Sequence, residues 1–383
     1  MRSETICNKD IAGLRESAGR KGTSRNVRTV SAVFVALLCL LPWAVSAQTV
    51  VTQYQPGVTV EGVTYCLPKT GFRVVVTAEK KVFTPGDLHK YAERYLRLGE
   101  VRTQAETQWV IKDIRLDAFG TPDTSKFYSI ALRDKTKAPY VTLASDGRLI
   151  AIRDAAQEPE MPEVPQPVAA KAAPNARRYF TQEMLAVGNK AKLAELVSQE
   201  IFDIRESYNA LVRGEAENSP KDGKQLELML QSLGEQEAAL TSLFVGTELV
   251  STEVFTFNVV PDQLYNKFMV ARFGDAVGLV DADNLAGAPL YLTIRALEPL
   301  LMEQDNAEAK KKKAKMQHSV RYNIPVKMEV TIADARKTYV KQEMMMGQFG
   351  RVEILSDVLF NKNATTRVQI NPVTGGLVNI AEE

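Results

Sequence analysis

The chain of 383 residues contains few of the residues that bind metals or act as nucleophiles. It has three cysteines and two histidines. Only Cys66 lies beyond residue 47, so no disulfide can form within that part of the chain. His89 and His318 are far apart in the sequence, and neither is close to Cys66. A Cys–His pair therefore exists only if the fold assembles one. We expect no catalytic, cofactor-binding or metal-binding residue.

Sequence motifs of nucleotide-binding proteins and hydrolases are also absent. The chain has no Gly-rich phosphate-binding loop and no Gly-x-Ser-x-Gly elbow. Glu200, Asp203 and Glu206 share a helical face, but carboxylate metal sites in helical bundles also use histidine and face inward. These acids fall off the apolar stripe described below. We therefore expect a solvated helix face.

Three successive methionines, Met344-Met345-Met346, raise the alternative of a Cu(I) site. Neighbouring side chains point in different directions, and no histidine or cysteine lies nearby. Core filler or an apolar contact surface is the expected role.

The chain also lacks a strong charge of either sign. Its formal net charge is +2, and removal of residues 1–47 leaves 41 Lys/Arg and 43 Asp/Glu, a net charge of −2. Without a positive field, a nucleic-acid partner is not expected. The composition is 45% hydrophobic and 25% charged, which is typical of a globular protein with room for two or three domains.

An apolar run at residues 30–41 is preceded by basic residues and followed by Val45-Ser46-Ala47. This order predicts a signal peptide, 1–47, cleaved after Ala47. An uncleaved anchor is the alternative, but the run is shorter than the roughly 20 residues that span a bilayer. We expect an exported protein that is periplasmic or associated with the outer membrane.

Residues 48–153 are expected to form an α+β domain. Val-, Thr- and Tyr-rich segments predict strands at 58–67, 72–82, 107–119, 127–132, 140–144 and 148–153. Pro68-Lys69-Thr70-Gly71 separates the first two, and Thr84-Pro85 predicts a helix start with Thr84 as the cap. Asp146-Gly147 is the strongest hairpin signal in the chain.

Residues 154–178 contain five prolines together with Ala, Glu and Gln. This composition predicts an extended spacer, and binding to a groove that recognises polyproline conformation is the alternative. The linker precedes the longest helical pattern of the chain.

Residues 179–246 predict an antiparallel helical hairpin. Apolar residues recur every three or four positions in both arms, the first arm begins at the cap Thr181, and it ends near Gly214. Ile204 and Leu233 lie on the two stripes. The stripes either seal the hairpin or form a partner-binding or oligomerising surface.

Residues 247–383 contain many short strand-like segments, which predict a second, mostly antiparallel β domain. The expected strands are 248–260, 268–273, 277–280, 290–296, 320–324, 327–332, 349–354, 366–370 and 376–380. Residues 145–152 and 373–380 both place a glycine turn before Leu-x-x-Ile, so the two β regions are either a diverged duplication or independent hairpins.

One basic cluster, Lys310, Lys311, Lys312, Lys313 and Lys315, lies between acidic residues and an expected strand. It is either a solvated loop or a contact with anionic lipid or lipopolysaccharide.

Several segments together give the chain a resemblance to a known family. They are the leader, Thr84-Pro85-Gly86-Asp87-Leu88, the hairpin from Ala138 to Ile152, Ile204-Arg205-Glu206, Leu243-Phe244-Val245-Gly246 and Asn371-Pro372-Val373-Thr374-Gly375. With these segments the chain resembles a family of unknown function whose members are exported proteins of Bacteroidota, anaerobic Gram-negative bacteria. The resemblance implies a cell-envelope location and no site residues.

The sequence as a whole predicts an α+β protein with a non-catalytic binding or scaffolding role in the cell envelope. A partner would be an envelope protein that contacts the helical hairpin. The alternative is an envelope enzyme or carbohydrate-binding protein whose site is assembled from the β domains.

Overall fold

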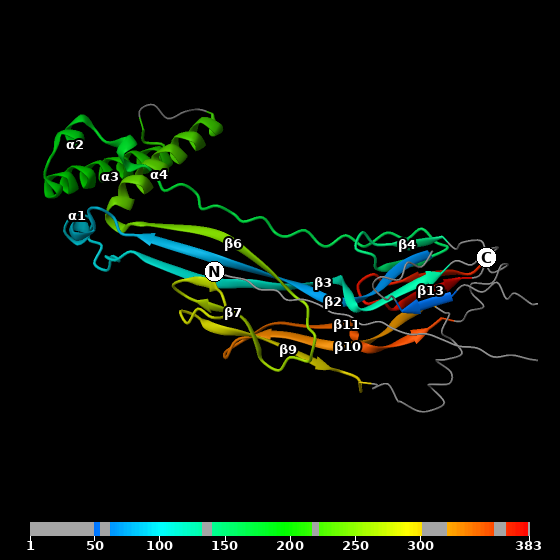
Figure 1. The fold of residues 1–383 in the computed structure, drawn as a ribbon. Helices are drawn as coiled ribbons and strands as arrows, with labels where there is room; N and C mark the ends of the chain where they lie inside the picture. Colours follow the sequence, from blue (N-terminus) through cyan, green and yellow to red (C-terminus); the bar gives the residue numbers. More distant parts are fainter. Residues whose placement is uncertain are drawn as a thin grey trace, which may run out of the picture. The chain divides into compact units, whose positions relative to one another are not determined.

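The computed structural model describes residues 50–53, 62–131, 140–216, 222–300, 320–355 and 365–381. The described residues belong to one compact unit, Ala47–Glu383. They form three antiparallel sheets and a small group of helices, which confirms the predicted α+β class (Figure 1). The predicted signal peptide and the lysine cluster at 310–315 lie outside the described residues, as does His318.

The first sheet has the strand order β1-β3-β2-β6. Its strands are β1 (Val50–Gln53), β2 (Gly62–Thr84), β3 (Glu106–Ala131) and β6 (Thr247–Val259). β2 pairs with β3 over almost its whole length and with β6 from Phe72 to Thr84.

The second sheet has the order β11-β10-β9-β7-β8. Its strands are β7 (Phe268–Gly274), β8 (Gly278–Val280), β9 (Ala288–Ala296), β10 (Arg321–Ala333) and β11 (Thr338–Ile354). Apolar side chains of this sheet pack against those of the first sheet in the largest core cluster, which includes Phe72, Val74, Leu292 and Met328. The two sheets therefore form a sandwich with a shared core.

The third sheet has the order β13-β12-β5-β4. Its strands are β4 (Val141–Leu143), β5 (Leu149–Ile152), β12 (Arg367–Ile370) and β13 (Leu377–Ala381). The predicted Asp146-Gly147 turn joins β4 to β5 as expected, with Gly147 in the left-handed region at φ +86°.

Strands from the two predicted β domains share sheets. β2 pairs with β6, and β5 pairs with β12. The predicted domain boundaries at 153 and 247 therefore do not separate the sheets, because the first and third sheets each contain strands from both predicted β domains. The two similar segments, 145–152 and 373–380, supply β5 and β13 to the same sheet and not to two separate ones.

Several strands predicted as pairs are single long strands. Residues 58–67 and 72–82 were expected to be separate, yet β2 is continuous, and β3 likewise joins 107–119 to 127–132. β10 joins 320–324 to 327–332. The register shifts between Cys66 and Pro68, and between Ile324 and Val326. A proline lacks the N–H of a ladder bond, and a shift lets the strand continue past it.

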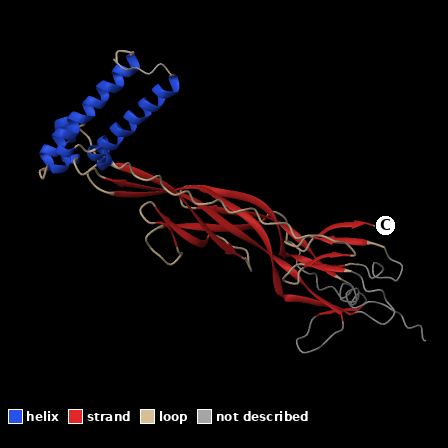
Figure 2. Ribbon diagram, turned by 90° about the horizontal axis from the view of Figure 1, so that it is seen from above, coloured by secondary structure: helices blue, strands red, loops and turns tan. Residues whose placement is uncertain are grey.

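The helices form a separate core. Thr181 caps only the short α2 (Gln182–Ala186), while Asn189 caps α3 (Lys190–Arg213), which ends as predicted at the left-handed Gly214. α4 (Gly223–Val245) packs beside α3, and Arg205 Nε donates to Glu237 Oε1 at 2.5 Å (Figure 2). None of the helices among the described residues is long and apolar enough to span a membrane.

The segment after Thr84-Pro85 does not begin a helix as expected. A short 3-10 turn, η1 (His89–Tyr91), leads into α1 (Ala92–Leu96). Leu88 N–H donates to Leu243 O of α4 at 2.8 Å, and a Cβ on Gly86 would lie 2.2 Å from the same oxygen. The backbone at Gly86 and Leu88 is thus in direct contact with the last turn of α4.

The proline-rich linker is extended, as predicted, and ends in a 3-10 turn, η2 (Ala176–Tyr179). It is also bound to the first sheet. Arg73 and Arg115 donate to the carbonyl oxygens of Pro162 and Glu163. Val168 forms an antiparallel bridge with Thr252 of β6. We call residues 162–168 the strap.

Candidate binding groove

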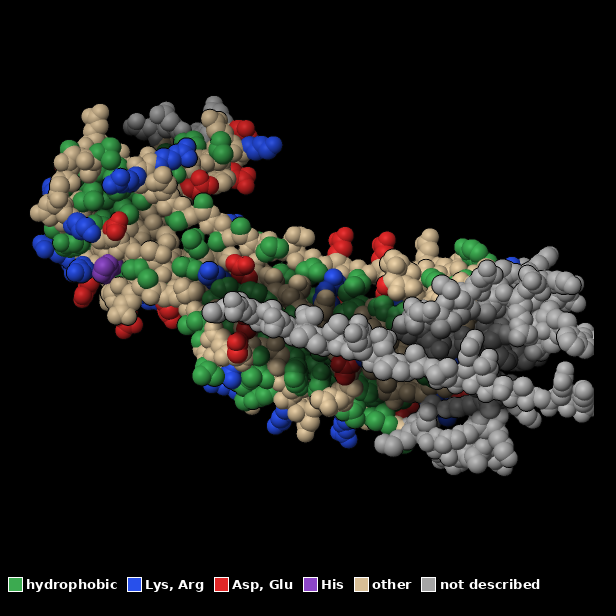
Figure 3. All heavy atoms as spheres, viewed as in Figure 1, with side chains coloured by type: hydrophobic (Ala, Val, Ile, Leu, Met, Phe, Trp, Pro, Cys, Tyr) green, Lys and Arg blue, Asp and Glu red, His purple; other side chains and the backbone are tan. Residues whose placement is uncertain are grey.

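A groove of about 1030 Å³ lies between β6 of the first sheet and β7 and β8 of the second. Such a volume is at the upper end of the range of small-molecule sites, about 300–1,000 Å³. Its walls are residues 254–260, Tyr265, 268–271, 279–282 and Asn284. Figure 3 shows apolar side chains gathered over the strands labelled β7 and β9 in Figure 1.

The backbone of β6 offers hydrogen-bonding groups to this groove. Thr252 N–H donates to Val168 O at 2.8 Å, and Val168 N–H donates to Thr252 O at 2.9 Å. Thr252 therefore points its N–H and C=O away from β2. The β2–β6 register contains no shift, so Val254, Thr256 and Asn258 point theirs the same way. No strand among the described residues pairs with these three positions.

The alternate residues of β6 form the apolar floor of the groove. Phe255, Phe257 and Val259 point toward the second sheet, where they pack on the edge of the shared core while remaining partly exposed. Val270 and Leu279 reach the same core from the opposite wall. The core of the sandwich is therefore open to solvent along this side.

The first half of β7 forms the wall of the groove opposite β6. β9 pairs with β7 from Phe268 to Phe273, but β8 reaches only Arg272 to Gly274. Residues 268–271 therefore have no strand partner on the β8 side among the described residues. Phe268 is 46% exposed and stacks on Tyr265, with 4.4 Å between ring centroids.

Asp281 is the one charged residue among the residues lining the groove. It begins the loop after β8, which the half-buried Arg272 holds in place. Arg272 Nε donates to Ala282 O at 2.9 Å, and its Nη1 donates to Gly287 O at 3.0 Å. The groove is thus nearly uncharged, with an apolar floor and unpaired peptide groups on its edge.

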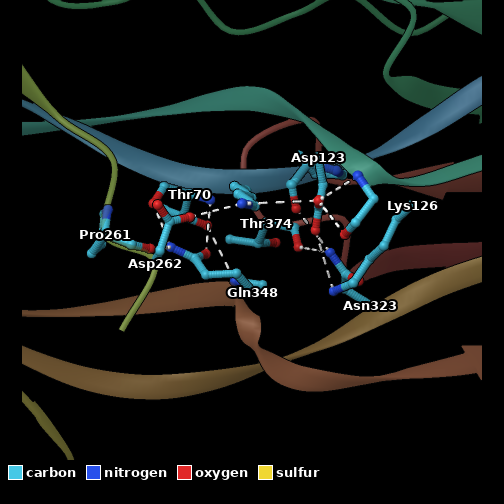
Figure 4. A network of polar contacts seen from close by, with 12 residues as sticks. Thr70, Asp123, Lys126, Pro261, Asp262, Asn323, Gln348 and Thr374 are labelled. Atoms are coloured by element: carbon cyan, nitrogen blue, oxygen red, sulfur yellow. Dashed lines mark hydrogen bonds and ion pairs between the residues drawn. The ribbon is translucent and has the colours of Figure 1, made fainter. Parts of the chain in front are cut away.

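A second polar feature is the junction of the three sheets (Figure 4). Asn323 of β10 donates from Nδ2 to Pro68 O of β2 at 3.1 Å and to Thr374 O at 3.0 Å. Gln348 of β11 exchanges two hydrogen bonds of 2.9 Å with the backbone of Thr70. These side chains join strands far apart in the sequence. Thr70, Asn323 and Thr374 are buried there, so we assign the junction a structural role.

Asp123 lies at the same junction and is 2% exposed. Burial acts to raise the pKa of Asp123, but hydrogen bonds from Ser125 and the positive charges of Lys126 and Lys69 outweigh it, so the pKa lies below its usual value. Lys126 Nζ is 3.6 Å from Asp123 Oδ2. This carboxylate is held ionised by its partners.

Among the described residues, Cys66 and His89 lie in different elements, β2 and η1. Cys66 is fully buried, and burial, followed by the charge of Asp146, raises the pKa of its thiol to about 11. His89 lies in η1, with Nδ1 2.7 Å from Gly86 O. Among the described residues, no three His, Cys, Asp or Glu side chains are placed to hold a metal ion.

The other patterns follow the expected structural roles. Met344 and Met346 of β11 are buried in the shared core, whereas Met345 between them is 43% exposed. Asp203 and Glu206 lie on the exposed face of α3.

The apolar stripes seal one half of the helical hairpin. Ile204 is buried with Leu240 and Phe244 in the helical core, and Leu233 packs against it. In the other half Tyr208, Leu226 and Leu230 line a cavity of about 510 Å³ between the arms, so that part of the stripe is open.

The groove was not predicted from the sequence. The alternation at 248–260 correctly predicts β6, but it does not tell which strand lies at a sheet edge. Two features of the sequence could have indicated the groove. Phe255, Phe257 and Val259 lie on one face of the expected strand 248–260, and the expected strand 277–280 is too short to cover the whole of the strand before it, 268–273.

The comparisons with known proteins give a family but no activity. No curated protein and no solved structure matches the chain. One family model, described as a domain of unknown function (DUF4831), matches residues 61–378. This match covers the helices and strands of all three sheets. The chain therefore belongs to the DUF4831 family of unknown function.

Proposed function

We propose that this protein is a non-catalytic binding or scaffolding protein of the cell envelope and that it holds its partner in the groove beside β6. The observation that supports this proposal is the chemistry of the groove walls. They combine the exposed edge of an apolar core with unpaired peptide groups and a single carboxylate, Asp281. Such walls suit recognition by burial and backbone hydrogen bonding.

The proposed location comes from the sequence. Residues 1–47 have the pattern of a secretory signal peptide, and the family resemblance favours exported proteins of Bacteroidota. The protein would act in the periplasm or at the outer membrane.

The helical hairpin is a second surface for an envelope partner. Because Ile204 and Leu233 are used in the helical core, a partner would contact the outer faces of the helices. Phe202, Val212 and Leu228 are 49%, 59% and 67% exposed there. These residues, and not the stripe, are the ones to change in a binding experiment.

One observation favours carbohydrate binding as a second candidate. The stacked pair Tyr265 and Phe268 lies at the rim of the groove near Asn258 and Asn284. An exposed aromatic face beside amide groups suits the apolar face and hydroxyls of a sugar ring. A glycan array with the purified protein tests this alternative directly.

The test of the proposed function compares two matched variants in cross-linked envelopes. Phe268→Ala removes the exposed ring at the groove rim, whereas Leu285→Ala removes a residue that is 83% exposed outside the groove lining. We expect Phe268→Ala to lose cross-linked partners that the unchanged protein and Leu285→Ala both retain. Equal recovery from all three proteins would refute a role for the groove.

A further inference from the structure

We propose that the free edge of β6 binds an extended, uncharged polypeptide segment, which adds a strand to the first sheet. This inference rests on the proposed function, because it names the partner class for the same groove. It depends on three observations: the unpaired peptide groups of β6, the strap that already pairs with this edge, and the open apolar core beneath.

The unpaired backbone groups of β6 are arranged to bind an extended peptide. Val254, Thr256 and Asn258 each direct one N–H and one C=O into the groove, in the alternation of an antiparallel ladder. An extended peptide satisfies such groups in pairs, as in strand addition to a sheet edge. A sugar or a compact ligand has no comparable periodic set of donors and acceptors.

The strap shows that this edge accepts an added segment. Val168 and Thr252 exchange both of their backbone hydrogen bonds, which is the first pair of an antiparallel ladder. The strap does not continue that ladder, because among the described residues no backbone hydrogen bond joins residues 162–167 to Val254, Thr256 or Asn258. The strap therefore occupies one end of the edge and leaves the rest free.

The same geometry sets the length of the bound segment. The free stretch runs from Val254 to Val259, the end of β6. At a rise of about 3.4 Å per residue, this stretch pairs with roughly five or six residues of an antiparallel partner. Thr252 is already paired with Val168, the last residue of the strap, so the bound segment ends before Thr252.

The walls of the groove set its side-chain chemistry. On one face of the added strand, alternate side chains would meet Phe255, Phe257 and Val270 at the edge of the core, which favours Val, Ile, Leu or Phe at those positions. Among the described residues, the groove lining contains one carboxylate, Asp281, and no lysine or arginine. An acidic segment would find no cationic partner there, and a segment with several basic residues would find only Asp281, so the bound segment is largely uncharged with apolar residues at every second position.

The experiment uses random nonapeptides displayed on phage as the probe, followed by synthetic copies of the enriched sequences. We expect enrichment of peptides with apolar residues at alternate positions and no acidic residue. Binding of the synthetic peptide to the full chain, measured by fluorescence anisotropy, should slow amide hydrogen exchange at Val254, Thr256 and Asn258. Failure to enrich such peptides overturns the inference.

A matched pair of variants tests the backbone contact. Thr256→Pro removes an outward N–H without removing a bond to β2, whereas Thr256→Val keeps the N–H and the strand propensity. We expect at least fivefold weaker peptide binding by Thr256→Pro and unchanged binding by Thr256→Val. If Thr256→Pro does not fold, N-methylation of alternate peptide amides makes the same test from the ligand side. Equal affinity of the methylated and unmethylated peptides overturns the inference.

The outcomes separate this inference from the proposed function. If no peptide binds but Phe268→Ala still abolishes partner capture, the groove functions with another kind of ligand and only the strand-addition inference is overturned. If light scattering shows a dimer that Thr256→Pro dissociates, the added strand belongs to a second copy of this chain, and the proposed uncharged partner segment is wrong.

Discussion

Replacement of Asn323 by alanine should weaken the junction of the three sheets. The side chain is fully buried on β10 and donates to Pro68 O of the first sheet and to Thr374 O in the turn between β12 and β13. Truncation removes both donors and leaves two buried carbonyl oxygens without this partner. Each buried acceptor deprived of its hydrogen bond costs about 1–3 kcal/mol. Removal of Asn323 Oδ1, which is buried without a hydrogen-bond partner among the described residues, offsets part of this cost, so we expect a loss of about 2–4 kcal/mol in the free energy of unfolding.

Urea unfolding followed by circular dichroism measures this loss. The control is Asn379→Ala, because Asn379 is exposed on β13 and should change stability by no more than about 0.5 kcal/mol. The midpoint for Asn323→Ala should fall while the dependence of the free energy on urea stays constant. A loss below about 1 kcal/mol would show that these hydrogen bonds do not hold the sheets together.

Three further predictions concern the helical core, acid stability and the buried thiol. Ile204→Ala should reduce the free energy of unfolding by about 2–5 kcal/mol, whereas Leu228→Ala, which changes a residue that is 67% exposed, should have little effect in the same urea titration. Because the folded-state pKa of Asp123 is lowered, its ionised form contributes stability above the unfolded pKa, and this contribution is lost as pH falls through the folded pKa. An acid titration should therefore show that Asp123→Asn flattens the pH dependence of stability below about pH 4. Cys66, with its pKa raised to about 11, should resist maleimide at pH 8 until urea unfolds the protein, and mass spectrometry of the Cys66 peptide would contradict this if it found label in the folded state.

The features that were predicted correctly depend on neighbouring residues. Asp146-Gly147 defines a turn by its own backbone preferences, and Gly214 ends α3 because it adopts the left-handed conformation that a helix terminus needs. Thr181 caps a helix as expected, although that helix is α2 and α3 begins after a second cap, Asn189. At each of these positions the neighbouring residues are enough to predict the local structure.

The features that were missed depend on residues far apart in the sequence. Strand breaks were expected at Pro68 and between residues 324 and 327, but β2 and β10 continue there through shifts of register that only the pairing with β3 and β11 reveals. The groove escaped prediction for the same reason. Val254 and Thr256 have an ordinary strand pattern, and their free backbone groups become apparent only once β6 is known to be the edge of its sheet.

The shared sheets also determine when this chain can fold during synthesis. Phe72 of β2 pairs with Val259 of β6, and Ile152 of β5 pairs with Val368 of β12, so neither sheet is complete until distant parts of the chain exist. A growing chain that has reached the helices still exposes one edge of β2 and one edge of β5. Closing such long loops is slow, and exposed strand edges promote aggregation. The edge of β2 therefore stays exposed until residue 259 has emerged and the edge of β5 until residue 370, whereas the α3–α4 hairpin can form before either point.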